Sequence, residues 1–228
     1  MIYPIEIKNL CYRHKGKDVN VFKDINFKVN AKEILAIVGL SGCGKSTLCY
    51  CLSGVIPHVY KGSFNGEVLI DGKKTTNMKL SNISINVGIV FQNPDMQLFM
   101  PTVEDEIAFG PENLCLSKEK ISKRIDYALE RVGMKKHRYS NPNNLSGGEK
   151  QLIALASVLS LKPRVIIFDE TMAQIDDKGK KRIKSVIKGL KEEGKSVIMV
   201  EHDLENLDIA DRVLHLHDGK LKKFSGKL

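Results

Sequence analysis

The chain has 228 residues and a net charge of +9, from 36 Lys and Arg against 27 Asp and Glu. This length suits one sizeable core with an elaboration, and the longest apolar runs fall far short of the roughly 20 residues of a membrane-spanning helix. Five cysteines without a C-x-x-C pair disfavour both a disulfide framework and a zinc site. Because no basic-then-apolar leader is visible, we expect the chain to stay in the cytosol. The positive charge favours contact with phosphate, anionic lipid or nucleic acid without choosing among them.

The first half of the chain begins with strand patterns and then becomes helical. Short alternating segments are followed by a wholly apolar run, which predicts a buried strand that ends in a glycine-rich loop. A helical pattern starts after Thr47 and gives way to two further strands. From about residue 95 to 160 apolar residues recur at helical spacing, which predicts a helical insertion. The strands are expected at residues 5–10, 25–29, 34–38, 66–71 and 87–91.

The last third of the chain returns to strands. Residues 165–168 and 196–200 predict buried strands, and the apolar residues of 183–190 between them have helical spacing. This order predicts a βαβ unit of a parallel sheet. A final strand at residues 213–217 is followed by the Asp-Gly pair of residues 218–219, which favours a hairpin.

Residues 39–46, GLSGCGKS, match the phosphate-loop pattern G-x-x-x-x-G-K-[ST] between a buried strand and a helix. The glycines let backbone N–H groups turn toward a β-phosphate, and the following helix presents its positive end. Lys45 is expected to reach the β- and γ-phosphates, and Ser46 to offer its hydroxyl to Mg²⁺. The motif predicts binding of a nucleoside triphosphate, but does not separate a kinase, a GTPase and a transport motor. The expected contacts are Gly39, Ser41, Gly42, Cys43, Gly44, Lys45, Ser46 and Thr47.

Two acids, Asp169 and Glu170, follow a buried strand at the edge where parallel sheets bind ligands. Asp169 is expected to hold Mg²⁺ through water, and Glu170 to polarise the water that attacks the γ-phosphate. The structural alternative is that these acids only cap the next helix.

Residues 145–151, LSGGEKQ, predict a second anion-binding helix start. Ser146 and the backbone N–H groups of Gly147 and Gly148 would form it. In isolation the segment could be only a capped helix beginning. Together with the phosphate loop it gives one chain two phosphate-binding helix starts.

In the order of these motifs the sequence resembles the ATP-binding cassette (ABC) family over essentially the whole chain. The resemblance implies that two cassettes meet head to tail, so that residues 146–148 of one touch the γ-phosphate held by the other. It implies that Gln92 senses Mg²⁺ and the attacking water, and that His202 is the switch histidine on the γ-phosphate. Asp176 matches the aspartate that lies across the dimer interface.

Some positions depart from the family pattern. The aromatic residue that stacks on adenine aligns with His14 here, and Tyr12, two residues earlier on the same strand face, is the alternative. Glu149 stands where glutamine is frequent, and residues 171–175 are unusual, although their length keeps Asp176 in register. Cys43 lies near a helix N-terminus and Lys45, conditions that lower a thiol pKa, so we expect alkylation to block ATP binding; the alternative is a tolerated variable position.

Residues 90–99 and 101–113 resemble the energy-coupling-factor and cobalt-type importer ATPases in particular. In those proteins this region docks against coupling helices of a transmembrane partner. The alternative is that the same apolar side chains fill the core of the helical lobe. The candidate contact residues are Met96, Leu98, Phe99 and Met100.

The fold that these observations predict is α/β: a P-loop NTPase parallel-sheet core with an N-terminal antiparallel β subdomain and an inserted α-helical subdomain. The whole chain, 1–228, forms one ABC ATPase domain. Residues 1–92 and 161–228 form the nucleotide-binding core with the β subdomain, and residues 93–160 the helical signature subdomain.

The function implied is an ATP-hydrolysing subunit, with ATP and Mg²⁺ as cofactors, that energises an importer of the energy-coupling-factor type for a vitamin or a transition-metal ion. The expected partners are a second cassette, identical or related, a transmembrane coupling protein and a substrate-binding membrane subunit. The subunit is expected in the cytoplasm, peripheral on the inner face of the cell membrane. Cobalt, nickel, biotin, thiamine and riboflavin all stay open as substrates.

Two other functions were weighed. A soluble cassette protein acting on nucleic acid or the ribosome would use the +9 charge. However, DNA-repair relatives need long coiled-coil or zinc insertions and translation-type relatives carry two cassettes, so no direct nucleic-acid contact is expected. A regulatory binder without turnover is disfavoured because Glu170 and His202 are intact.

Overall fold

The structure, a computed structural model, describes residues 2–173 and 175–226. Within them the central sheet has the strand order β10-β9-β3-β8-β7-β6. All neighbours from β9 to β6 are parallel, and β10 pairs antiparallel with β9. The predicted α/β fold with a parallel core is therefore confirmed. The strands are β3 (Ile34–Val38), β6 (Val87–Val90), β7 (Val165–Asp169), β8 (Ser196–Glu201), β9 (Arg212–His217) and β10 (Lys220–Lys223).

A second, antiparallel sheet is built in the order β2-β1-β4-β5. Its first strand runs four residues beyond the predicted end, because the register shifts between Ile7 and Leu10 and Asn9 has a φ of +51°. Such a bulge breaks the period-two pattern on which a strand prediction depends. The strands are β1 (Ile5–His14), β2 (Phe22–Val29), β4 (Gly62–Ile70) and β5 (Lys73–Lys74).

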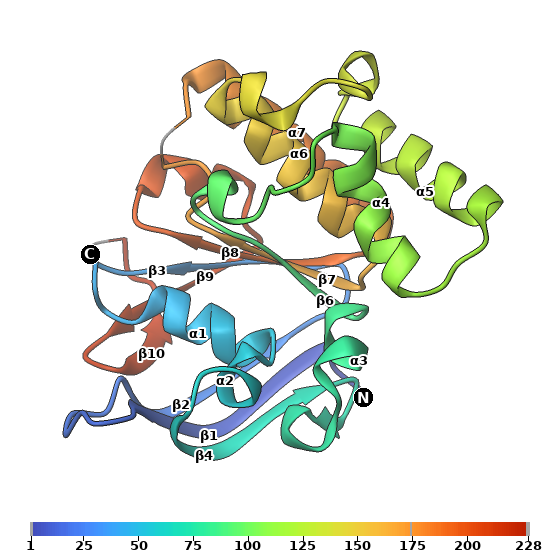
Figure 1. The fold of residues 1–228 in the computed structure, drawn as a ribbon. Helices are drawn as coiled ribbons and strands as arrows, with labels where there is room; N and C mark the ends of the chain where they lie inside the picture. Colours follow the sequence, from blue (N-terminus) through green and yellow to red (C-terminus); the bar gives the residue numbers. More distant parts are fainter. Residues whose placement is uncertain (1, 174, 227–228) are drawn as a thin grey trace.

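Each face of the central sheet has its own hydrophobic core, because side chains of a strand alternate between the two faces. On β3, Leu35 and Ile37 pack with the antiparallel sheet and the helix α1 (Lys45–Leu52). Ile34 and Ala36 of the same strand pack with the helices on the opposite face. In Figure 1, α1 consequently lies between the two sheets and the larger helices lie beyond the central one. On this side of the sheet α2 (Val55–His58) contacts α1, η1 (Thr75–Asn77) contacts β4, and α3 (Leu80–Ser84) contacts β6.

The predicted helical insertion is helical in the structure, with no strand among its described residues. α6 packs against α4, α5, α7 and the strand β6, so the insertion and the sheet share one hydrophobic cluster. The division at residues 92 and 160 therefore does not coincide with a separate core, and it stays a prediction. The elements are η2 (Pro94–Met96), α4 (Val103–Asn113), α5 (Lys118–Arg131), η3 (Lys135–His137), η4 (Pro142–Asn144), α6 (Gly147–Ser160) and, after β7, α7 (Asp177–Glu192).

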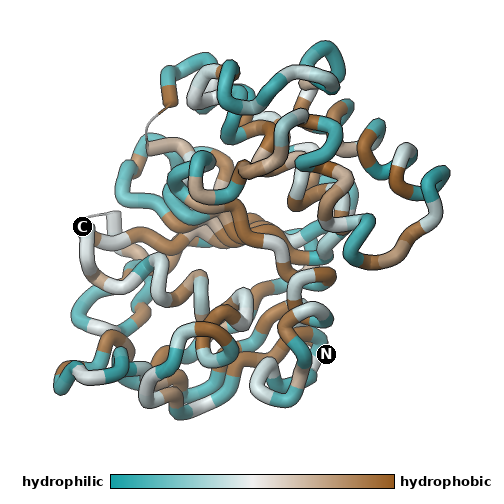
Figure 2. The backbone as a smooth tube through the Cα atoms, viewed as in Figure 1, coloured by the Kyte–Doolittle hydropathy of each residue, from teal (hydrophilic) through white to brown (hydrophobic). Residues whose placement is uncertain are grey.

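The chain closes with η5 (Leu204–Ile209) and the predicted hairpin. Asp218 and Gly219 have φ of +48° and +73°, the left-handed pair that a tight two-residue hairpin requires, and Lys220 faces His217 across it. Figure 2 shows the most hydrophobic segments along the central strands and polar segments on the outer turns. None of the described helices combines the length and the apolar character that crossing a bilayer demands.

Candidate functional site

The loop between β3 and α1 has a backbone that only glycine tolerates. Gly42 and Gly44 have φ of +79° and +105°. A Cβ on Gly39 would lie 2.5 Å from the backbone oxygen of Leu216. Gly44 also precedes α1 without a side-chain cap, so the N–H groups of the first helical turn are free to bind an anion.

Lys45 places its charge inside this loop. The side chain is only 4 % exposed, and its Nζ donates to the backbone oxygens of Gly39 at 2.8 Å and Leu40 at 3.0 Å. It also forms an ion pair of 3.1 Å with Oε1 of Glu170. The ammonium group is therefore held where the loop can present it to a phosphate. The other predicted loop residues share the same turn and first helical turn: Ser41, Gly42, Cys43, Ser46 and Thr47.

Ser46 and Asp169 form an oxygen pair next to Lys45. The Ser46 hydroxyl donates to Oδ1 of Asp169 at 3.1 Å. Burial raises the pKa of the Asp169 carboxyl, while the hydrogen bond from Ser46 acts in the opposite direction. A hydroxyl and a carboxylate are hard oxygen ligands that suit Mg²⁺ when phosphate oxygens and water complete an octahedron. The residues present thus fit this ion.

The Glu170 carboxylate lies between Lys45 and His202. Its backbone N–H donates to Val200 of β8 at 3.0 Å, and its φ is +50°. While Oε1 contacts Lys45, Oε2 lies 3.1 Å from Nδ1 of His202, which follows β8. Parallel pairing of β7 with β8 thus brings the acidic pair and the histidine to one edge of the sheet, as the sequence predicts.

Gln92 lies two residues after the end of β6, and it is exposed. The backbone just before it is held by the helical lobe: Gln151 Nε2 donates to the Phe91 oxygen at 2.9 Å, and Phe91 N–H donates to Gln97 at 3.2 Å. This link was not among the contacts predicted from the sequence. The position of Gln151 was a usable signal: it lies among the buried residues of α6, and a buried side-chain amide needs a hydrogen-bond partner.

The second predicted anion site is the start of α6. Ser146 and Glu149 form a capping box: Oε2 of Glu149 accepts from the Ser146 N–H at 3.0 Å and from its hydroxyl at 2.8 Å. These hydrogen bonds are the main reason that the Glu149 pKa is lowered. Glu149, which stands where the family frequently has glutamine, therefore holds Ser146 in place at the start of α6.

Asp176 lies beside this helix start. It caps α7 by accepting from the Gly179 N–H at 2.9 Å, and with Ser146 and Gly148 it lines a pocket of about 190 Å³. None of the residues that line this pocket comes from the phosphate loop. The two predicted phosphate-binding helix starts thus belong to separate surfaces. Of the unusual segment 171–175, Gln174 lies outside the described residues.

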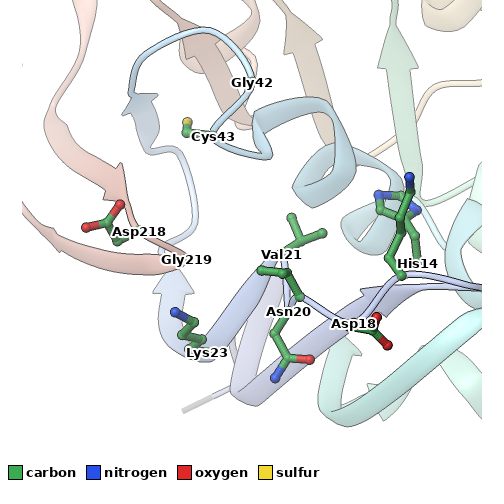
Figure 3. Close-up of a pocket in the computed structure, with 11 residues that line it drawn as sticks. His14, Asp18, Asn20, Val21, Lys23, Gly42, Cys43, Asp218 and Gly219 are labelled. Atoms are coloured by element: carbon green, nitrogen blue, oxygen red, sulfur yellow. The ribbon is translucent and has the colours of Figure 1, made fainter.

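An open pocket of about 510 Å³ borders the phosphate loop. Figure 3 shows Cys43 on one side of it, Asp218 of the last hairpin on another, and His14 at the end of β1. Tyr12, the alternative for stacking on adenine, is completely buried in the core under the antiparallel sheet, and its hydroxyl lies 3.4 Å from His14 Nδ1. The prediction for Tyr12 is therefore wrong, because only His14 reaches the open end of the strand.

Cys43 also differs from its prediction. Its side chain is half-buried against the loop, and a Cβ on Gly39 would lie 2.7 Å from Sγ. Burial raises the pKa of the Cys43 thiol, and the nearby Lys45 only partly offsets that rise. The sequence shows the helix start and Lys45, both of which lower a thiol pKa. Only the fold shows the burial of the thiol, whose effect on the pKa is larger and of opposite sign.

Comparison with known proteins decides the family. The family model described as ABC transporter matches residues 22–173. The chain belongs to this ABC transporter family. A Pyrococcus abyssi protein assigned as an ABC transporter ATP-binding protein is 42% identical over 219 residues, covering 95% of this chain and 78% of the relative. EcfA1 of Streptococcus pneumoniae, an energy-coupling factor transporter ATP-binding protein, is 39% identical, covering 97% of this chain and 79% of EcfA1.

Some ABC transporter relatives are much longer than this chain. In a protein of Methanosarcina acetivorans assigned as an ABC transporter ATP-binding protein, 44% identical, the chain covers 34% of the relative's length. A second such protein, from Methanosarcina mazei, is covered over 38%. The chain therefore corresponds to about a third of these two proteins.

Solved ABC structures share the fold. CbiO1 from Clostridium perfringens, part of the ABC transporter complex CbiONQ, superposes with a TM-score of 0.87 at 31% identity, covering 97% of this chain and 88% of CbiO1. The ATP-binding cassette MJ0796, a dimer in a post-hydrolysis state with ADP and Pi, gives 0.82 at 26% identity, covering 98% of this chain and all of that one. The resemblance to ABC ATPases of the energy-coupling-factor type is confirmed, and the chain is an ABC ATPase domain that binds ATP.

Proposed function

We propose that this chain hydrolyses ATP to energise an importer of the energy-coupling-factor type, for a vitamin or a transition-metal ion. The observation that carries the hydrolytic part is the chain of contacts Lys45–Glu170–His202 beside Ser46 and Asp169. The names of EcfA1 and of the CbiONQ complex support the type of importer. The substrate would be selected by membrane subunits, so it stays open within these two classes.

ATP binding would change the partners of Lys45. In the structure its ammonium contacts the Glu170 carboxylate at 3.1 Å. A triphosphate in the loop is a stronger attraction for the ammonium, and its arrival would leave Oε1 of Glu170 free to accept a proton from the attacking water. His202 would meanwhile keep hold of Oε2 and so orient the carboxylate. Ser46 and Asp169 would hold Mg²⁺, which when bound neutralises charge on the β- and γ-phosphates.

A second cassette would complete the site. The start of α6 and Asp176 line a pocket that contains no phosphate-loop residue, so one chain cannot close both around the same γ-phosphate without rearrangement. The dimeric state of MJ0796 with ADP and Pi supports a pair of cassettes. We infer that residues 146–148 of each subunit meet the nucleotide of the other, and that the partner is a second copy or a related ATPase.

A membrane partner would dock on the helical lobe. Of the four candidate contact residues, Met96 and Phe99 are exposed, whereas Leu98 packs against the hydrophobic cluster that the lobe shares with the sheet. Phe99 also stacks edge-on against Phe109, with ring centroids 5.0 Å apart. An exposed aromatic pair beside a flexible methionine is suited to contact with a coupling helix. The subunit would then lie in the cytoplasm against the inner face of the cell membrane.

Gentle purification of the tagged chain from native membranes tests the importer assignment. Integral membrane subunits are expected to co-purify with the wild-type chain, and Phe99→Glu is expected to lose most of them because it places a charge in the apolar contact. Glu119→Gln, an exposed change on α5, is the control and should retain them. Recovery with ribosomes or DNA in place of membrane subunits would contradict the proposal.

A further inference from the structure

Glu201 is a buried acid directly behind the proposed reaction site. It is the last residue of β8, its side chain has no exposed surface, and it precedes His202. Oε2 accepts a hydrogen bond from Asn206 Nδ2 at 3.2 Å. Oε1 has no hydrogen-bond partner among the described residues. A buried carboxylate in this state would be costly, whereas a neutral carboxylic acid is tolerated.

The Glu201–Asn206 hydrogen bond anchors the loop that carries His202. Asn206 is buried in η5, and the bond joins the end of β8 to that turn across five residues of chain. Asp203 caps the same turn by accepting from the Glu205 N–H at 3.0 Å. His202 therefore projects toward Glu170 from a short segment that is fixed on both sides.

The charges around Glu201 disfavour its ionised form. The pKa of the Glu201 carboxyl is raised to about 7, chiefly by burial, and the acids Glu170 and Asp203 contribute in the same direction. The Asn206 hydrogen bond and Lys180 of α7, whose Nζ lies 3.5 Å from Asp203, act in the opposite direction. Because this folded-state pKa lies above the ordinary one, the neutral form prevails at low pH and is lost as pH rises through about 7.

We propose that Glu201, as a neutral acid bonded to Asn206, is a positioning residue that holds His202 against Glu170. The inference rests on the proposed hydrolytic role of Glu170. When Glu201 loses its proton, a charge appears in the interior that forms no ion pair among the described residues, where Lys180 contacts Asp203 instead. The side chain must then gain water or leave its place, and the anchor of the His202 loop is weakened. Turnover should therefore fall on the alkaline side while ATP binding is unaffected.

The test is the pH dependence of ATP hydrolysis at saturating ATP, with Glu201→Gln as the main variant. Glutamine keeps an acceptor for Asn206 and cannot ionise. Wild-type kcat is expected to fall about fivefold between about pH 6 and pH 8.5, and that of E201Q to stay within about twofold, with KM for ATP alike in both. Glu205→Gln, an exposed acid of the same turn, should follow the wild type. An alkaline fall in E201Q that matches the wild type would overturn the proposal.

A second variant separates positioning from packing. Glu201→Leu fills the same interior space without the Asn206 bond, so it should fold and yet lose about tenfold in kcat at every pH. Wild-type kcat in folded E201L would also contradict the proposal.

Glu170→Gln distinguishes a failure of the role of Glu201 from a failure of the proposed function. If E170Q is inactive and E201Q behaves as the wild type, only the role of Glu201 is wrong; if E170Q is fully active, the proposed function itself fails.

Discussion

Lys45 and Glu170 show why single residues of this site depend on their surroundings. Each is identifiable from its motif, but the ion pair between them exists only because β3, β7 and β8 end at one edge of the sheet. The same dependence explains the two errors at this scale. Tyr12 and His14 share a strand face, and only the fold reveals that the Tyr12 side chain is buried in the hydrophobic core. Cys43 has the neighbours of a reactive thiol, but its partial burial raises the pKa of the thiol.

Alkylation of the cysteines tests the corrected view of Cys43. Because burial raises the pKa of the Cys43 thiol, little thiolate is present near neutral pH and iodoacetamide should modify it slowly. Cys115 is exposed and serves as a control within the same chain. Mass spectrometry of a time course near pH 7 is expected to show Cys115 modified at least about tenfold faster. Faster modification of Cys43 than of Cys115 would contradict this account.

At the scale of elements, the strongly periodic segments were the predictable ones. The apolar run of β3 begins and ends where it was predicted, and the last hairpin turns at the expected Asp-Gly pair. β1 was predicted too short because its bulge at Asn9 interrupts the alternation. Most contacts between elements were not predictable: the buried position of Gln151 on α6 indicates that it needs a polar partner, but nothing in the spacing of the chain identifies that partner as the Phe91 carbonyl.

Gln151 and Lys150 offer matched tests of how α6 is joined to residues 91–95. Gln151 is buried and satisfies the Phe91 oxygen, whereas Lys150 forms an ion pair of 2.7 Å with the exposed Asp95. Gln151→Ala should lower the free energy of unfolding by about 1–3 kcal/mol, because it removes the partner of a partly buried carbonyl. Lys150→Ala should cost under about 1 kcal/mol, as surface pairs do. Urea unfolding of both variants is the measurement, and equal losses would refute the distinction.

At the scale of the whole molecule, one sheet serves two cores and separates two tasks. The face with α1 and the antiparallel sheet supports the phosphate loop, while the face with α6 and α7 supports the pocket that Ser146, Gly148 and Asp176 line. The fold class was predictable because the phosphate loop and the acidic pair each come at the end of a strongly apolar strand, β3 and β7. The division of the chain at residues 92 and 160 was not settled by the fold, because the helical lobe and the sheet share one core.

In the proposed function, one bound nucleotide supports both hydrolysis and the pairing of two cassettes. Replacing the proposed base, Glu170→Gln, should leave the phosphate loop intact, since its glycines and Lys45 are unchanged. ATP should therefore still bind and hold two cassettes together, but the water would no longer be polarised.

The most direct test measures ATP turnover and sedimentation of E170Q and the wild type side by side, with Glu119→Gln as a surface control. We predict that E170Q hydrolyses ATP at least about 100-fold more slowly and sediments as a dimer when ATP is present. E119Q should match the wild type in both measurements. Turnover of E170Q at the wild-type rate would contradict the account.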